Sequence, residues 1–257
     1  MANLIEGKTA LVTGGGSGIG RSTAIAFGAA GAKVVVADVD EAGGKETVAQ
    51  IEAAQGTAMF VTADVSKASD VENMVNATVA AYGGLDCAFN NAGIQGALDQ
   101  TADCTEENWD RITGINLKGV WLCMKYEIAH MLKSGGGAIV NNSSNFGLVG
   151  SNGMPAYSAA KHGVIGLTKT AALEYAQSSI RVNAVCPGPV QTPLVDKILS
   201  AQPDLADGII ASIKEREPIG RFGQPEEIAT AVVWLCSPEA SFVVGAILPV
   251  DGGFVAQ

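Results

Sequence analysis

A tyrosine and a lysine four residues apart are the first residues in this chain that could carry acid–base chemistry. Tyr157 and Lys161 lie in a stretch with helical periodicity, where residues four apart share a face. A phenol with a pKa of about 10 is a poor base at neutral pH, and a neighbouring ammonium would lower that pKa. No other tyrosine of the chain has a lysine at this spacing. The pair alone is also compatible with an exposed helix surface, so further signals are needed.

A glycine-rich turn is the second signal. The segment Thr13–Gly20 (TGGGSGIG) lies between an apolar run and a helical stretch. Its glycines do not have the G-x-G-x-x-G spacing, but they allow a tight turn and the close approach of a pyrophosphate at a helix N-terminus. Asp38 follows about 20 residues later, where a carboxylate can accept the ribose hydroxyls of a dinucleotide. The alternatives are a simple packing turn and a helix-capping aspartate.

The elements that position these residues follow from alternating apolar runs and helical stretches. Strands are expected at Lys8–Thr13, Lys33–Asp38, Thr57–Ala63, Leu85–Phe89, Ala138–Ser143, Arg181–Cys186 and Ala246–Val250. Helices are expected at Arg21–Ala30, Glu41–Ala54, Ser69–Tyr82, Glu106–Lys133, Ala156–Ala176 and Pro225–Leu235. This pattern predicts an α/β fold: one domain over 1–257, a Rossmann-type doubly wound parallel sheet of about seven strands with helices on both faces. The segment 187–223 is expected to form a flap over the substrate side.

Composition narrows the class of partner. The 257 residues carry a formal net charge of -10, which disfavours nucleic acid and anionic membranes as partners. The five cysteines contain no C-x-x-C pair, so we expect neither a disulfide framework nor a metal site, and a reducing, cytoplasmic location. No signal-peptide core and no apolar run long enough to span a membrane is expected.

Several motifs together resemble the short-chain dehydrogenase/reductase family, from about Lys8 to Phe254. Thr13–Gly20 resembles the family's T-G-x-x-x-G-x-G turn, and Asn90–Gly93 resembles its N-N-A-G motif. The family's catalytic tetrad is matched by Asn116, Ser144, Tyr157 and Lys161. Pro187–Gly188 with Thr192 resembles its P-G-x-x-x-T loop, and Asp251–Gly253 resembles its usual ending. The resemblance implies that Tyr157 is the catalytic acid/base. It also implies that Lys161 lowers the pKa of Tyr157 and holds the nicotinamide ribose, while Ser144 hydrogen-bonds the substrate oxygen.

The same resemblance implies that Asn116 orders a water and Lys161 in a proton relay; an exposed helical position is the alternative. Asp64 would accept the adenine amino group or, alternatively, be solvated. The residues expected to bind NAD are Gly14, Ser17, Gly18, Ile19, Gly20, Asp38, Val39, Asp64, Val65, Asn91, Gly93, Tyr157, Lys161, Val190 and Thr192.

The predicted function is an NAD(H)-dependent oxidoreductase that moves a hydride between a secondary alcohol, or its ketone, and nicotinamide. A catalytically silent dinucleotide sensor or scaffold and a 3-oxoacyl thioester reductase-like activity are the alternatives. A serine hydrolase is disfavoured because neither His130 nor His162 pairs with a G-x-S-x-G elbow. A mostly apolar substrate pocket without a fixed charge is expected around Gln95, Asn145, Phe146, Met154 and Leu194.

Cofactor choice and assembly complete the expectations. Asp38 should repel the 2′-phosphate of NADP, and neither Ser17 nor Val39 supplies a compensating cation, so we expect NAD preference. Arg21 is the one residue that could reverse this. The two long helices carry more apolar surface than one sheet face needs, at Val120, Trp121, Met124, Ile128 and Met131. The family resemblance implies that two such helices pack against their mates across one two-fold axis and that the C-terminal strand and tail pair across another, so we expect a homotetramer of dihedral symmetry.

Overall fold

The computed structural model describes residues 4–193, 195, 208, 211 and 215–257. Within these residues, seven parallel strands form one sheet in the order β3-β2-β1-β4-β5-β6-β7. The strands are β1 (Thr9–Thr13), β2 (Lys33–Asp38), β3 (Thr57–Thr62), β4 (Cys87–Asn90), β5 (Gly137–Asn142), β6 (Ile180–Pro187) and β7 (Ile247–Val250). This confirms the predicted doubly wound parallel sheet.

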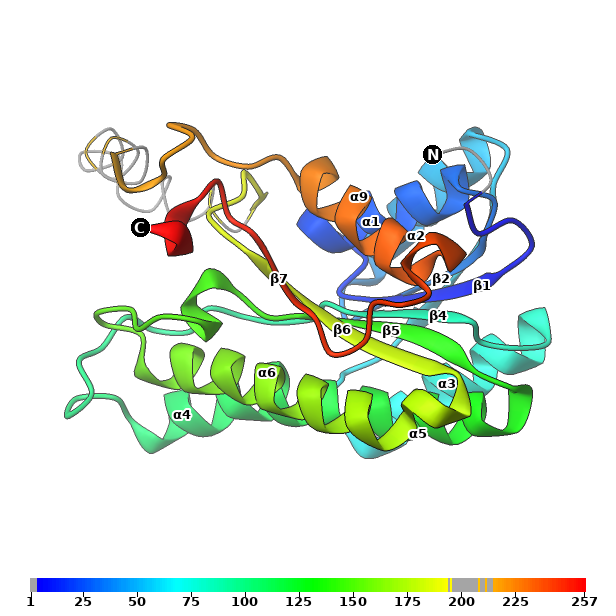
Figure 1. The fold of residues 1–257 in the computed structure, drawn as a ribbon, viewed down its shortest axis with the longest axis horizontal. Coiled ribbons are helices and arrows are strands. Elements are labelled where there is room, and N and C mark those ends of the chain that lie inside the picture. The colour runs from blue at the N-terminus through cyan, green and yellow to red at the C-terminus, as the bar shows by residue number, and fades with distance from the viewer. Residues whose placement is uncertain (1–3, 194, 196–207, 209–210, 212–214) are drawn as a thin grey trace.

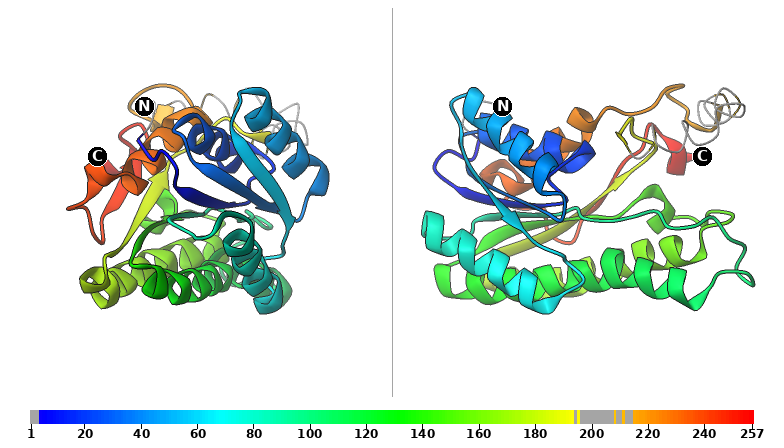
Figure 2. Two further views of the ribbon diagram at one scale, coloured as in Figure 1. Left: turned by 90° about the vertical axis from the view of Figure 1, so that its right-hand side faces the viewer. Right: turned by 180° about the vertical axis from the view of Figure 1, so that it is seen from behind.

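Helices cover both faces of the sheet (Figures 1 and 2). One layer contains α1 (Gly18–Ala29), α2 (Glu41–Ala53) and α9 (Pro225–Cys236). The other contains α3 (Ala68–Tyr82), α4 (Glu106–Thr113), α5 (Val120–Ser134) and α6 (Pro155–Tyr175). Short 3₁₀ segments are η2 (Asn145–Gly147), η3 (Ala176–Ser178), η4 (Pro238–Ala240) and η5 (Phe254–Ala256).

The strands are apolar on both faces because each face packs against helices. Val34 and Val36 of β2 belong to the core on the α1 and α9 side, whereas Val35 and Ala37 belong to the core on the α3, α5 and α6 side. The chain adds β1, β2 and β3 outward in one direction and then returns to place β4 on the other side of β1. That reversal opens a crevice beyond the carboxyl ends of β1 and β4, where such sheets bind ligands.

The structure confirms a continuous helical stretch over Glu106–Lys133, but this stretch is not a single α-helix. A π-helical segment, η1 (Gly114–Gly119), separates α4 from α5. Its Asn116 side chain is fully buried and hydrogen-bonds the backbone of Ile94, which lies outside the helix. Single π-helical turns of this kind often lie near functional sites. The exposed position considered for Asn116 is wrong.

The apolar residues of α5 serve mainly the core. Val120, Met124, Ile128 and Met131 are buried against the sheet, so the surplus apolar surface expected from them is absent. Trp121 differs, with 44% of its surface exposed. No helix within the described ranges is long and apolar enough to cross a membrane. Much of the predicted flap, together with Leu194, lies outside the described residues, and the one-domain organisation over 1–257 stays a prediction.

Candidate active site

A cavity of about 360 Å³ lies at the crevice formed by the glycine turn and the carboxyl ends of the first strands. We call it the turn cavity. Most residues predicted to bind the dinucleotide line it: Gly14, Ser17, Gly18, Ile19, Asp38, Val39, Asp64, Val65, Asn91, Gly93, Tyr157, Lys161 and Thr192. Its lining also includes Ala63, Ala92, Ile94, Ile115, Asn142 and Pro193.

The glycines of the turn fit the chain where side chains would collide. Gly14 has φ +63°, and a Cβ there would lie 2.9 Å from the Ala92 Cα atom. Gly18 has φ +50°, and a Cβ there would lie 3.2 Å from Thr192 Cγ2. The Asn91 side-chain amide donates to the carbonyl oxygens of Thr13 and Gly14, at 3.0 and 3.2 Å. The turn is thus fixed close to the loop that follows β4.

The start of α1 suits an anionic group. Ser17 is the N-cap residue, yet its side chain makes no capping hydrogen bond, and the first turn contains no acidic residue. The amide groups and the positive end of the helix dipole at this point are therefore not compensated by a carboxylate. This arrangement fits the pyrophosphate of a dinucleotide.

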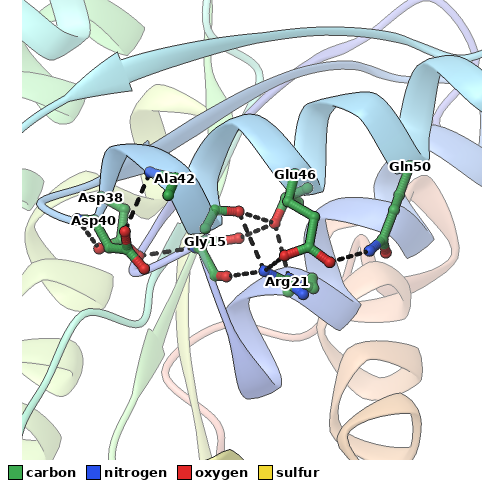
Figure 3. A network of polar contacts seen from close by, with 10 residues as sticks. Gly15, Arg21, Asp38, Asp40, Ala42, Glu46 and Gln50 are labelled. Carbon is green, nitrogen blue, oxygen red and sulfur yellow. Dashed lines mark hydrogen bonds and ion pairs between the residues drawn. The ribbon is translucent and has the colours of Figure 1, made fainter.

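Asp38 and Asp40 have separate tasks at the end of β2. Asp40 caps α2 by accepting from the Ala42 amide at 3.1 Å, so the capping role considered for Asp38 is wrong. Asp38 accepts from the Gly16 amide at 2.8 Å and from the Asp40 amide at 2.9 Å (Figure 3). These bonds hold its carboxylate at the wall of the turn cavity, beside the exposed Val39.

Arg21 is engaged between α1 and α2 (Figure 3). Its guanidinium donates to Thr47 Oγ1 at 3.1 Å, to the Gly43 carbonyl at 3.2 Å and to Glu46 at 3.0 Å, as well as to the Gly16 carbonyl. Arg21 therefore fastens the glycine turn to α2, and these contacts hold its charge there. It does not line the turn cavity.

Asp64 follows β3 and is half-buried in the turn cavity. Its Oδ1 atom accepts from the Ser66 amide at 3.0 Å and from the Ser66 hydroxyl at 2.7 Å. These hydrogen bonds hold the pKa of Asp64 below its usual value, with the Lys67 ammonium at 3.4 Å helping. An ionised acceptor consequently stands at the far wall of the cavity.

Two residues predicted to contact the dinucleotide lie elsewhere. A Cβ on Gly20 would lie within 2.6 Å of Asn91 Nδ2 and even closer to the Gly14 carbonyl, so Gly20 packs inside the turn and does not line the cavity. Val190 is buried and lines a second, neighbouring cavity. Both positions serve local packing of the turn and of the loop after β6.

The tyrosine, lysine and serine of the predicted tetrad lie where the turn cavity meets the second cavity. Pro155 is at the start of α6 and places Tyr157 and Lys161 one turn apart on the same face. The Lys161 Nζ atom lies 5.6 Å from the Tyr157 ring centroid and donates to the Asn142 carbonyl at 2.7 Å. Ser144 follows β5, and its hydroxyl donates to Asn145 Oδ1 at 3.0 Å and accepts from the Phe146 amide at 3.1 Å.

The pKa values of this pair are dominated by burial. Burial raises the pKa of Tyr157 above its usual value, and the nearby Ser144 hydroxyl only partly opposes this. Burial also lowers the pKa of Lys161 to about 8. Both shifts have the same cause, because loss of hydration disfavours the charged form of each group. The lowering of the Tyr157 pKa by Lys161 stays a prediction.

Two buried asparagines support the site. Asn116 Oδ1 accepts from the Ile94 amide at 2.8 Å, and its Nδ2 donates to the Ile94 carbonyl at 2.7 Å, so the whole amide positions the wall beside Gly93. Asn142, which sequence reasoning missed, lines both cavities and donates to Asn91 Oδ1 at 2.9 Å. Its Oδ1 atom is buried without a partner among the described residues. A polar residue ending an apolar strand was the available signal.

The second cavity, of about 300 Å³, is called the reaction cavity here because Ser144 and Tyr157 line it. Gln95, Asn145, Phe146 and Met154 line it as predicted, whereas Leu194 is not among the described residues. The expectation of no fixed charge is wrong, since Arg216 and Glu217 also contribute to the wall. Burial and the nearby Asp251 carboxylate raise the pKa of Glu217 to about 7. Phe254 of the C-terminal segment completes the lining.

The chain has extensive similarity to known proteins. The family model described as enoyl-(acyl carrier protein) reductase matches residues 14–255. The cyclohexanol dehydrogenase of Acinetobacter sp. (strain SE19) is 42% identical over 257 residues, which is all of this chain and 98% of the relative. A 2,5-dichloro-2,5-cyclohexadiene-1,4-diol dehydrogenase of Sphingobium indicum is 45% identical over 253 residues, 98% of each chain. The crystal structure of levodione reductase superimposes with a TM-score of 0.95 at 37% identity, covering 98% of this chain and 99% of that one.

This chain belongs to the short-chain dehydrogenase/reductase family. The family assignment confirms the resemblance and supports a general oxidoreductase role. Dehydrogenases of this family use nicotinamide cofactors. Among the described residues, no group of three or more His, Cys, Asp or Glu side chains is placed to hold a metal ion.

Proposed function

We propose that this protein is an NAD(H)-dependent oxidoreductase that transfers a hydride between a secondary alcohol, or its ketone, and nicotinamide. The observation that carries the proposal is the position of Tyr157, whose side chain borders both the turn cavity and the reaction cavity. A group that exchanges a proton with a substrate alcohol must lie at this junction, because the hydride leaves the adjacent carbon toward the other cavity. The names of the cyclohexanol and diol dehydrogenase relatives support the same reaction class.

The residues around the junction have matching chemical roles. Tyr157 takes the alcohol proton during oxidation and returns it to the developing alkoxide during reduction. Ser144 donates a hydrogen bond to the substrate oxygen, where negative charge develops. Lys161 holds a positive charge beside the phenol and would hold the nicotinamide ribose when the cofactor is bound. Asn116 keeps the Gly93–Ile94 wall in place for the relay that the family resemblance implies.

The turn cavity fits a nicotinamide dinucleotide. The uncompensated N-terminus of α1 would hold the pyrophosphate, Asp38 the adenosine ribose, and Asp64 the adenine amino group. The bound nicotinamide would supply the hydride acceptor or donor. Asn142 Oδ1, buried and without a partner among the described residues, is available to a polar group at the boundary between the two cavities.

NAD preference is part of the proposal. Asp38 offers a carboxylate where NADP carries its 2′-phosphate, and Val39 beside it has no charge. Arg21 was the residue that could offset this repulsion, but its guanidinium is held by Thr47, Gly43 and Glu46. No compensating cation from the glycine turn therefore lies at the described part of this wall.

Turnover of secondary alcohols with NAD⁺ tests the proposal directly. The purified protein should reduce NAD⁺ in the presence of at least one member of a panel of cyclic and open-chain secondary alcohols, read at the nicotinamide absorbance. The reverse reaction should proceed with the corresponding ketone and NADH. Binding of NADH without turnover of any alcohol or ketone would instead indicate a dinucleotide sensor or scaffold.

A homotetramer is also proposed, but from fewer exposed apolar residues than the sequence analysis expected. Leu117, Trp121 and Leu167 line an open hollow of about 700 Å³ on the outer face of the helical layer. Phe242 and Leu173 are also exposed, at 100% and 85%. An exposed apolar patch on a helical face is typical of an interaction surface between subunits, and the family resemblance gives the dihedral arrangement. Light scattering at micromolar concentration should give four times the chain mass, and a monomer mass would contradict the proposal.

A further inference from the structure

The last residues of the chain form one wall of the reaction cavity. Phe254, the first residue of the 3₁₀ turn η5, lines this cavity together with Phe146, which follows β5. Their ring centroids lie 6.1 Å apart with an interplanar angle of 88°, an edge-to-face contact. The Arg216 guanidinium carbon lies 5.3 Å from the Phe254 ring centroid. Figure 1 shows the C-terminal segment beside the chain that follows β6.

Backbone contacts fix the position of this wall. The Asp251 carboxylate accepts from the Gly253 and Val255 amides, each at 3.0 Å. Gly253 has φ +94°, a conformation that favours glycine, and it turns the chain back toward the cavity. The Gln257 side chain donates to the Arg216 carbonyl at 3.1 Å. Phe254 is therefore presented to the cavity by a braced turn.

The size and lining of the cavity restrict what can react at Tyr157. About 300 Å³ is at the lower end for ligand pockets, which span roughly 300–1,000 Å³. Ser144 and Tyr157 would hold the reacting oxygen, while Phe146, Met154 and Phe254 offer an apolar surface to the rest of the substrate. A compact hydrocarbon ring can contact this surface on several sides. A long acyl chain could not be enclosed in a cavity of this volume.

We propose that Phe254 is a specificity-determining residue that, with Phe146, makes the reaction cavity selective for compact cyclic secondary alcohols and ketones over extended acyl thioesters and open-chain alcohols. The inference rests on the proposed oxidoreductase function and names its substrate class. It assigns this role to the C-terminal turn, a segment outside the motifs of the turn cavity.

The experiment compares Phe254→Ala with Val255→Ala in the full-length enzyme. Val255 lies in the same turn, but it does not line the reaction cavity. Values of kcat/KM are measured with NAD⁺ for cyclohexanol and for 2-octanol, together with the NADH dissociation constant. Phe254→Ala should lower kcat/KM for cyclohexanol about tenfold and leave that for 2-octanol unchanged or higher, because apolar pocket contacts discriminate roughly 10–200-fold. Val255→Ala should leave the ratio of the two values at its wild-type level.

The outcomes separate this inference from the proposed function. An equal loss for both alcohols in Phe254→Ala, an unchanged ratio, or the same change of ratio in Val255→Ala would overturn the role of Phe254 while turnover itself still stood. Wild-type preference for 2-octanol or for a 3-hydroxyacyl thioester would overturn it too. If Phe254→Ala does not fold, Phe254→Leu should produce a smaller shift of the ratio in the same direction. Failure of the wild type to oxidise any alcohol would overturn the proposed function and this inference together.

Discussion

The turn cavity and the reaction cavity adjoin at Tyr157, yet the chain builds them differently. The turn cavity is formed largely by loops that follow β1, β2, β3 and β4; the first three are short, and the one after β4 extends to the start of α4. The reaction cavity draws on segments after β5 and β6, on Arg216 and Glu217 and on the C-terminal turn. The difference teaches that one half of the site comes from a repeated βα pattern, while the other half is assembled from segments that lie far apart in the sequence.

The junction of the two cavities has its own support in the core. The side chain of Asn90, at the end of β4, donates to Glu127 of α5 at 3.0 Å and to Asn141 of β5 at 3.0 Å. Asn141 donates in turn to Thr168 of α6 at 2.9 Å. All four side chains are buried. The strand that leads into the turn cavity and the strand that leads to Ser144 are thereby held in register by polar side chains.

The largest expected effect is at the junction itself. Tyr157→Phe should lower kcat by about a hundredfold or more, since proton transfer by a positioned group contributes typically 10²–10⁴-fold. NADH affinity should stay within a few-fold of wild type because the ring still packs beside Lys161.

Because the pKa of Tyr157 is raised, the rate of alcohol oxidation by the wild type should increase with pH as the phenol ionises. Steady-state kinetics in both directions and NADH titration check this, and more than a tenth of wild-type kcat would exclude the role.

Most residues of the turn cavity could be predicted from the sequence, and the features that could not be predicted have physical reasons. Asp38 and Lys161 could be predicted because glycine spacing, strand ends and helical periodicity act over short distances, whereas Asn91 was predicted only through the family resemblance. The π turn was not predicted, and neither was the contact of its Asn116 side chain with Ile94, 22 residues away. The helix propensities of the residues in one segment cannot indicate a contact with a residue outside that segment.

The wall of the reaction cavity shows the same limit more strongly. Arg216, Glu217 and Phe254 lie at the cavity only because β6, β7 and the turn at Gly253 bring their segments together. Arg216 and Glu217 fall within the predicted flap segment 187–223, but no local pattern distinguishes these two residues, or Phe254, as site residues. Asn142 is an intermediate case. Its polar side chain at the end of a buried strand can be read from the sequence, but its hydrogen bond to Asn91 cannot.

The next effect concerns the contribution of Glu127, in the buried network behind the two cavities, to the stability of the fold. Burial raises the pKa of Glu127 from 4.5 to about 7, and its Oε1 atom, like Asn90 Oδ1, has no partner among the described residues. A neutral acid can donate a hydrogen bond where a carboxylate cannot. The folded state therefore binds a proton that the unfolded state releases. The stabilisation is fully present below about pH 4.5 and is lost as the pH rises to about 7, at a cost on the order of 3 kcal/mol.

Glu127→Gln should remove this pH dependence and make the protein more stable than wild type at pH 8, since the amide stays neutral and can donate. Urea unfolding between pH 4.5 and 8 measures the free energy of unfolding for both proteins. Glu174→Gln, at an exposed position near the end of α6, is the matched control and should follow the wild type. A Glu127→Gln curve parallel to that of the wild type would show that Glu127 is ionised in the fold.

The smallest expected effect lies entirely within the turn cavity and concerns cofactor choice. Two unit charges about 4 Å apart at an effective dielectric of about 20 repel by roughly 4 kcal/mol, an upper figure at a site that solvent screens. Even half of that value exceeds a tenfold preference for NAD over NADP. Asp38→Ala with Val39→Arg removes the carboxylate and adds a cation at the exposed neighbour, so the preference should shift toward NADP. Arg21 cannot substitute for the new cation while it holds Thr47 and Glu46.

Values of kcat/KM for NAD and NADP, measured on the same alcohol, give the shift. Asp40→Ala is the matched control, because it removes a carboxylate two residues away that caps α2 and does not line the turn cavity. It should cost about 1 kcal/mol of stability and leave the cofactor ratio unchanged. Equal kcat/KM values for the two cofactors in the wild type would mean that Asp38 does not face the ribose.

The double variant should keep the wild-type ratio of the kcat/KM value for cyclohexanol to that for 2-octanol, since the reaction cavity is built from other segments. A change in that ratio would show that the two cavities are not independent.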